Sequence, residues 1–280
     1  MNVGKVNYYN HSSKPNCVFV ENKELPLICI DLWFKAGSAF EESNKSGTAH
    51  FLEHMIFKGS NKVMPGEFDH KIESLGGFSN ASTGYDDAHY YVLIPRNNFK
   101  ESLALLTNIV LSPSININEF EKEKSVVIDE IKQQNDQPDE KLFNYFLSRV
   151  WKDNNYGKTI LGTEKDVQSL EISDLENFHK RFYNKENLCI AVAGNLSHRV
   201  FREYYENKDF SVGTLSIAKK IAESTKSKSL ISIVGGGDTV ASIKNTGLEK
   251  GFTHLSTAGG AFLESLEGKE LPGIKALKRN

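Results

Sequence analysis

The sequence contains few cysteines and no long apolar run. Only three of its 280 residues are cysteine, Cys17, Cys29 and Cys189, and no two of them show C-x-x-C spacing. This argues against a disulfide framework and a thiolate metal site, so we expect a reducing, cytoplasmic setting. If an export signal lay upstream of this start, the same sequence would fit a periplasmic protein equally well. No stretch reaches the roughly 18 apolar residues of a membrane span, so we expect no membrane partner.

A large excess of either charge is also missing. The chain has 34 Lys and Arg residues against 36 Asp and Glu residues, a net charge of -2. Without a basic field, nucleic acid is not indicated as a partner. The 39% hydrophobic and 25% charged content is typical of a globular protein, with room for one large or two ordinary domains. A small or peptidic substrate fits this composition better than a polyanion.

Up to about residue 205, short strand-like runs alternate with helical runs. A strand is expected at 26–39, and two more flank the turn at 84–87 as a hairpin would. Ser173 and Glu176 have capping-box spacing at the start of one helix. Antiparallel strands with helices grouped between them predict an α+β fold, an antiparallel sheet with packed helices. The expected helices are 47–58, 66–75, 99–111, 118–134, 138–151 and 173–182.

The remaining residues follow a different pattern. The strand-like runs "LISIVGGGD" (230–238) and "THLSTA" (253–258) alternate with helical runs, which is the rhythm of a short α/β parallel βαβα fragment. The polar stretch "SHRVFREYYENKD" has no clear period, and we place a boundary within it. The predicted domains are therefore 1–205 and 206–280.

The stretch "SGTAHFLEHMIFKGS" (46–60) sets three titratable side chains in an apolar run. At about 100° per helical residue, His50, Glu53 and His54 share one face. Two imidazoles four residues apart can bind one divalent metal ion, most often Zn²⁺, and Glu53 can reach a water beside it. The alternative is a chance pattern with structural or exposed histidines.

A third ligand is expected from "NEFEKEKSVVIDEIKQQND" (118–136). Glu123 and Glu130 lie two helical turns apart on one face, near Val126 and Val127. Charges on the apolar side of a helix indicate pairing or metal coordination, which makes Glu130 the best candidate. The alternative is that this lysine- and glutamate-rich run is a solvated helix face.

These segments together carry a family resemblance. "SGTAHFLEHMIFKGS" resembles the H-x-x-E-H signature of the inverzincin peptidases, the family of pitrilysin, insulin-degrading enzyme and mitochondrial processing peptidase. "LGGFSNASTGYDDAHYY" is similar to that family's hairpin and "EKEKSVVIDEIKQQNDQP" to its third-ligand helix, with Glu130 76 residues beyond His54. "YGKTILGTEKDVQSL" and "FHKRFYNKENLCIAVAGNLS" continue the similarity to about residue 198.

The resemblance implies a zinc endopeptidase that cleaves peptides or unstructured proteins, alone or with a second peptidase-like subunit. It also implies β-augmentation, in which an extended substrate pairs with an edge strand. The implied zinc ligands are His50, His54 and Glu130, the general base is Glu53 with Glu123 in support, and the substrate-binding residues are Asn80, Ala81 and Thr83.

The carboxyl-terminal run "LISIVGGGDTVASIK" places three glycines between a strand and a helix, a setting that suits a phosphate group. Residues 209–277 resemble the last segment of phosphoglycerate kinase, with Ala258 departing from its S-T-G-G-G-A motif. The kinase's amino-terminal domain has no counterpart here, so we expect no phosphoryl transfer. The candidate nucleotide-binding residues are Gly235, Gly236, Gly237, Asp238 and Thr239.

Three functions therefore stay open from the sequence. The first is a zinc endopeptidase domain. The second is a truncated or fusion product that binds zinc without turnover, because the family usually follows this domain with a second one that encloses the substrate. The third is a nucleotide-binding remnant of phosphoglycerate kinase.

Overall fold

The protein is described by a computed structural model covering residues 4–10, 14–207, 221–227, 230–235, 240, 243 and 248–256. The chain divides into two compact units, Met1–Phe201 and Arg202–Asn280, which are treated separately below. None of the helices in the described ranges has both the length and the apolar character that crossing a bilayer requires.

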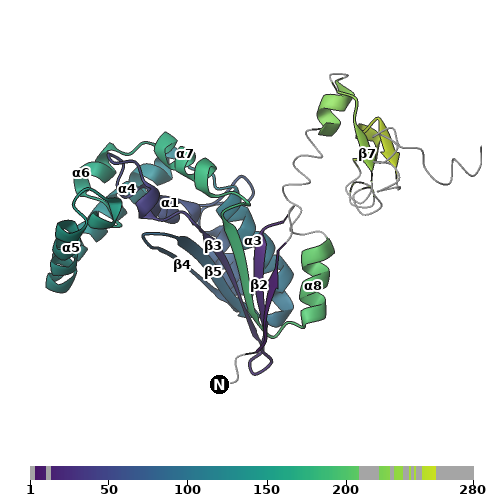
Figure 1. The fold of residues 1–280 in the computed structure, drawn as a ribbon, viewed down its shortest axis with the longest axis horizontal. Coiled ribbons are helices and arrows are strands. Elements are labelled where there is room, and N and C mark those ends of the chain that lie inside the picture. The colour runs from purple at the N-terminus through teal and green to yellow at the C-terminus, as the bar shows by residue number, and fades with distance from the viewer. Residues whose placement is uncertain are drawn as a thin grey trace, which may run out of the picture. The chain divides into compact units, whose positions relative to one another are not determined.

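The first unit is built on a six-stranded sheet with strand order β1-β2-β6-β3-β5-β4 (Figure 1). Neighbouring strands are antiparallel except β2 and β6, which are parallel. The mostly antiparallel sheet with packed helices confirms the α+β class predicted from the sequence. The strands are β1 (Val6–Tyr9), β2 (Asn16–Glu21), β3 (Leu27–Phe34), β4 (Phe78–Thr83), β5 (Ala88–Pro95) and β6 (Leu188–Gly194).

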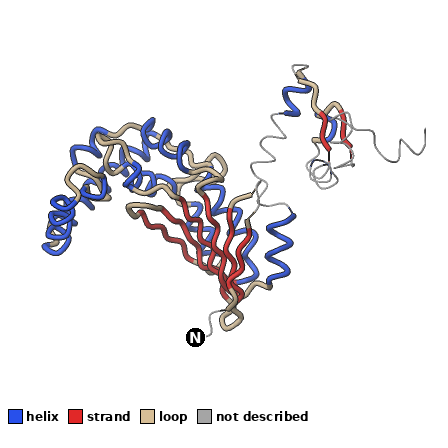
Figure 2. Tube along the Cα trace, viewed as in Figure 1, coloured by secondary structure: helices blue, strands red, loops and turns tan. Residues whose placement is uncertain are grey.

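The helices gather beyond one end of the sheet and along one of its faces (Figures 1 and 2). The six expected helices all form, with ends shifted by one or two residues at most. They are α1 (Thr48–Ile56), α2 (Glu67–Ser74), α3 (Phe99–Leu111), α4 (Ile117–Asn135), α5 (Pro138–Val150) and α7 (Ile172–Phe182). Two further helices form, α6 (Glu164–Ser169) and α8 (His198–Asn207), and α8 runs across the boundary between the two units.

The core lies between the sheet and these helices. Alternate residues of β3 and β5 are buried, as expected for strands covered on one face. Helix α1 buries the apolar side that its sequence pattern predicted, and Phe51 stacks on Phe120 of α4 with ring centroids 4.8 Å apart. This aromatic contact sets how closely α1 approaches α4.

Two local expectations were wrong. The stretch thought to lack a period forms α8, because Phe201 and Tyr205 lie one helical turn apart and are both buried, although charged residues surround them. Helix α7 also begins one residue earlier than expected: the backbone N–H of Glu171 donates to Asp174 Oδ2 at 2.8 Å, so these residues form the cap instead of Ser173 and Glu176.

In the second unit, β7 (Ile233–Gly235) and β8 (His254–Ser256) pair in parallel, as the sequence pattern indicated. Gly235 ends β7. Gly236, Gly237, Asp238 and Thr239, together with Ala258, lie outside the described residues. The nucleotide-binding assignment therefore stays a prediction.

The Phe51–Phe120 contact generates a stability prediction. Replacing the fully buried Phe51 with alanine removes the ring and leaves a cavity, so the free energy of unfolding should fall by roughly 3–5 kcal/mol in a urea titration. Phe143→Ala is the matched control, because that ring is 55% exposed and its loss should change stability by less than about 0.5 kcal/mol. Equal effects of the two substitutions would contradict the assigned packing.

Candidate metal centre

Helix α1 is the element on which the site is built. It follows Gly47, whose φ of 89° lies in the left-handed region and whose added Cβ would stand 2.5 Å from the Leu161 carbonyl oxygen. Glycine is therefore needed there. The helix then turns its apolar side into the core and directs His50, Glu53 and His54 toward α4 and β4.

The structure brings His50, His54 and Glu130 together from two helices. The Nε2 atoms of His50 and His54 lie 3.6 Å and 3.4 Å from Glu130 Oε2, and one ligand atom from each residue lies within 4.8 Å of the other two. Two ligand atoms held at zinc distances in a tetrahedral site lie about 3.3–3.6 Å apart. The donor set and its spacing therefore fit one tetrahedral metal ion.

A second layer of contacts fixes one of the two rings. The Nδ1 atom of His54 lies 2.9 Å from Glu123 Oε1, and Lys58 Nζ lies 2.6 Å from the other oxygen of that carboxylate. This leaves Nε2 of His54 facing Glu130 and fixes the ring's orientation. By contrast, Nδ1 of His50 is buried without a hydrogen-bond partner in the part of the chain that the structure describes.

The two imidazoles differ in their affinity for a proton. Burial, reinforced by the neighbouring His54, lowers the pKa of His50 to about 4. Burial acts on His54 as well, but its hydrogen bonds with Glu123 and Glu130 outweigh that effect and raise its pKa to about 9. The ring centroids are 4.7 Å apart, so two positive charges would repel. Without a metal ion, His54 therefore takes up a proton more readily than His50 does.

Glu53 lies beside this cluster on the same helix. Its Oε2 atom accepts a short hydrogen bond from the Thr83 hydroxyl of β4, which fixes the carboxylate near the ligands. Burial raises the pKa of Glu53, and the Thr83 hydrogen bond acts in the opposite direction. A half-buried carboxylate with raised basicity, next to a metal-binding group, is suited to accept a proton from water.

The three residues expected to bind substrate lie on an edge strand. Asn80, Ala81 and Thr83 belong to β4, which has a neighbour on one side only. The N–H of Ala81 donates to Asn80 Oδ1 at 2.9 Å. A cavity of about 260 Å³ adjoins this edge; its lining includes His50, Glu53, Ala81, Ser82, Thr83, Tyr85, Glu140 and Phe143.

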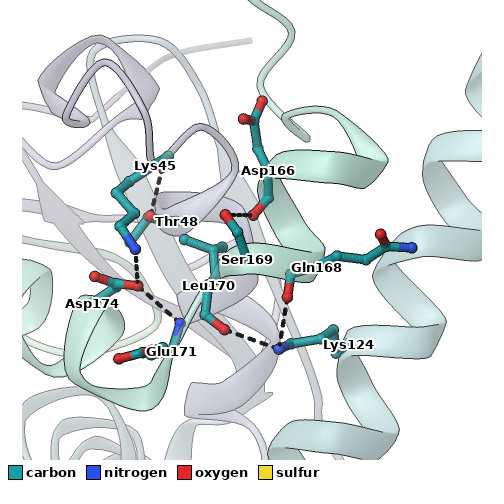
Figure 3. A network of polar contacts seen from close by, with 9 residues as sticks. All are labelled: Lys45, Thr48, Lys124, Asp166, Gln168, Ser169, Leu170, Glu171 and Asp174. Atoms are coloured by element: carbon teal, nitrogen blue, oxygen red, sulfur yellow. Dashed lines mark hydrogen bonds and ion pairs between the residues drawn. The ribbon is translucent and has the colours of Figure 1, made fainter.

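A polar network links the helices that carry the candidate ligands (Figure 3). Before α1, Lys45 forms an ion pair with Asp174 of α7, with 2.8 Å between Nζ and Oδ2. From α4, Lys124 donates to the Leu170 carbonyl oxygen at 2.9 Å, just ahead of α7. Both ligand-bearing helices are thus tied to one segment, which limits their movement relative to each other.

Sequence reasoning missed several residues at this site. It did not identify Lys58 as the second partner of Glu123, although Lys58 lies four residues beyond His54. It assigned Thr83 to the substrate and missed its bond to Glu53. It also gave no sign that Phe143 of α5 would line the cavity. The first two contacts follow from the position of α1 against α4 and β4, which a linear pattern does not carry.

Comparison with known proteins places most of the first unit in one family. The sequence model of the insulinase family, peptidase family M16, matches residues 18–164. The sequence model of phosphoglycerate kinase matches residues 203–269. An uncharacterized zinc protease of Rickettsia bellii is 33% identical over 193 residues, covering 68% of this chain and 47% of that protein. A probable mitochondrial-processing peptidase subunit beta of Arabidopsis thaliana is 32% identical, covering 60% of this chain and 32% of that protein.

Solved structures show the same fold. A protease from Helicobacter pylori is 29% identical with a TM-score of 0.68, over 73% of this chain and 50% of that one. A peptidase M16 inactive domain from Pseudomonas fluorescens, at 23% identity and a TM-score of 0.67 over 72% of this chain and 49% of that one, shows the fold alone. The chain spans between about a third and a half of the length of the curated relatives named above, 47% for the first and 32% for the second. From residue 18 to residue 164, the chain belongs to the insulinase family of peptidases, peptidase family M16.

Proposed function

We propose that this protein is a zinc-dependent endopeptidase domain. The observation that carries the proposal is the convergence of His50 Nε2, His54 Nε2 and Glu130 Oε2, with Glu53 adjacent to them on α1. Two histidines and one glutamate are a common ligand set for catalytic zinc and leave a coordination position open. The names of the matched relatives, which include zinc proteases, support the same metal.

The residues of the site divide the work of peptide hydrolysis. Zinc held by His50, His54 and Glu130 would supply Lewis acidity and make the attacking water more acidic. Glu53 accepts the proton of that water on its carboxylate and then delivers it to the leaving amine. Thr83 binds one oxygen of Glu53, so the other oxygen takes the proton. The reaction needs no covalent link between protein and substrate.

The edge strand β4 is the proposed binding site for the substrate backbone. An extended peptide alongside β4 would pair with the exposed backbone around Asn80 and Ala81, once the N–H of Ala81 leaves the Asn80 side chain. Such pairing uses main-chain hydrogen bonds, so it depends little on the substrate's side chains. It favours unstructured segments, because the backbone N–H and C=O groups of a folded substrate are mostly hydrogen-bonded already.

A second candidate function is zinc binding without turnover by this chain alone. Helix α5 has no buried residue and exposes a run of large apolar side chains beside the catalytic cavity. Together with the relatives named as subunits of a processing peptidase, this face suggests that a second peptidase-like subunit completes the site. The exposed residues on or next to α5 are Leu142, Phe143, Tyr145, Phe146, Val150 and Trp151.

Removal of the general base tests the proposed mechanism. Glu53→Gln keeps the size of the side chain but cannot accept the proton, so kcat on an unstructured peptide should fall roughly 10²–10⁴-fold. Zinc content, measured by elemental analysis, should stay at the unsubstituted level. Glu73→Gln, an exposed change on α2, is the control and should keep full activity.

The same assay separates the two candidate functions. Undiminished zinc-dependent cleavage by the Glu53→Gln protein would refute the endopeptidase mechanism. Bound zinc with no cleavage by the unsubstituted chain would favour the second candidate, and restored cleavage on adding a peptidase-like subunit would identify what is missing.

The partner of His54 generates a further prediction. Glu123→Gln removes the charge that orients His54 and pairs with Lys58, so the zinc dissociation constant should rise roughly tenfold or more, as judged by competition with a chelator. Glu121→Gln on the exposed side of α4 is the matched control and should leave the constant unchanged. Equal constants for all three proteins would contradict the role given to Glu123.

A further inference from the structure

A buried carboxylate outside the metal centre holds the start of the catalytic helix. Glu41 is 7% exposed, and both of its oxygens accept hydrogen bonds from the backbone. Oε2 accepts from the Gly47 N–H at 3.0 Å, and Oε1 accepts from the Ala49 N–H at 2.8 Å. One side chain therefore satisfies two of the N–H groups that a helix leaves unpaired at its first turn.

Among the residues that the structure describes, no other side chain caps the start of helix α1. Its N-cap residue is Gly47, which offers no side-chain acceptor. Glu41 supplies that acceptor from outside the helix, and its negative charge lies at the positive end of the helix dipole. The first turn so held includes His50, one of the candidate metal ligands, at the third helical position.

The segment that carries Glu41 is itself fixed. The side-chain amide of Asn155 donates to the carbonyl oxygens of Ala39 at 3.0 Å and Glu41 at 2.7 Å. From the same loop, Lys158 Nζ donates to the Ser43 carbonyl oxygen at 2.8 Å. The backbone on either side of Glu41 is thus held by the loop at residues 155–158, independently of helix α1.

We propose that Glu41 is a positioning residue for metal binding, whose ionised carboxylate fixes the first turn of α1 and so holds His50 Nε2 facing Glu130. The inference rests on the proposed function, since it concerns the same metal centre. Glu41 acts through its hydrogen bonds with the Gly47 and Ala49 N–H groups, which lie beside His50 in the sequence.

The charge of Glu41 changes within an accessible pH range. Burial raises its pKa to about 8, against the opposing effects of the Ala49 and Gly47 N–H groups and of Lys158, while Asp166 of α6 adds to the rise. A raised pKa means that the carboxyl is neutral below that pH and ionised above it. The complete clamp therefore forms as pH rises through about 8, and metal binding should tighten with it.

The test compares zinc dissociation constants for the full chain, Glu41→Gln and Glu42→Gln. Glu42 is the exposed neighbour, so its substitution removes the same charge without a helix contact. At about pH 9, Glu41→Gln should bind zinc roughly five- to tenfold more weakly, as expected for a lost helix cap, and Glu42→Gln should match the unsubstituted chain. Near pH 6.5 the Glu41→Gln difference should shrink, because the unsubstituted carboxyl is then mostly neutral.

The outcomes separate this inference from the proposed function. Absence of zinc binding by the unsubstituted chain would refute both the proposed metal centre and the role of Glu41. Zinc binding that is identical in the unsubstituted and Glu41→Gln proteins at every pH would overturn the role of Glu41 alone, and so would equal weakening by Glu42→Gln.

A measurement on the unsubstituted chain covers the case in which Glu41→Gln does not fold. The carbon resonance of the Glu41 carboxyl, in protein labelled at glutamate, reports its titration directly. Linkage requires that a carboxylate which strengthens zinc binding tenfold titrates about one pH unit lower when zinc is bound. Superimposable titration curves with and without zinc would overturn the proposal.

Discussion

The packing of α1 on α4 is the constraint on which the site depends. One face of α4 carries Phe120 and Glu123 one turn apart, then Glu130 two turns further on, so apolar and acidic groups share one helix surface. The Phe51–Phe120 stack draws α1 against that surface and leaves its imidazoles opposite the carboxylates. Placing a charged carboxylate on a partly buried surface costs free energy unless the charge is paired. Each of the two carboxylates accordingly has a cationic or metal-binding partner.

The environment then gives similar side chains different roles. Glu123 lies between His54 and Lys58, and these partners lower its pKa although burial opposes them. Glu130 also has a lowered pKa, chiefly through its hydrogen bond with His54. Glu53 has no cation at hydrogen-bond distance among the described residues, and burial raises its pKa. Two carboxylates suited to stay charged and one suited to exchange a proton are what metal-assisted hydrolysis requires.

Much of this could be predicted from local sequence. Helix periodicity placed His50 and His54 on one face, since such patterns depend on neighbours three or four residues apart. Glu130 was the best candidate for the third ligand because it lies near valines on the face of Glu123 and because the segment resembles the third-ligand helix of the peptidase family. The role of Glu41 could not be predicted, because its partners depend on a loop closed by Asn155, more than a hundred residues away. The failure at α8 had the opposite cause: its two buried aromatic residues were hidden among charged ones.

The central claim is that two imidazoles and one carboxylate from separate helices hold a single zinc ion. The most direct test is a crystal structure of the zinc-treated chain with anomalous diffraction recorded at the zinc absorption edge. The account predicts one strong peak bounded by His50 Nε2, His54 Nε2 and Glu130 Oε2, at about 2.0–2.2 Å from each. A peak elsewhere, or zinc bound with Glu130 turned away from it, would contradict the account.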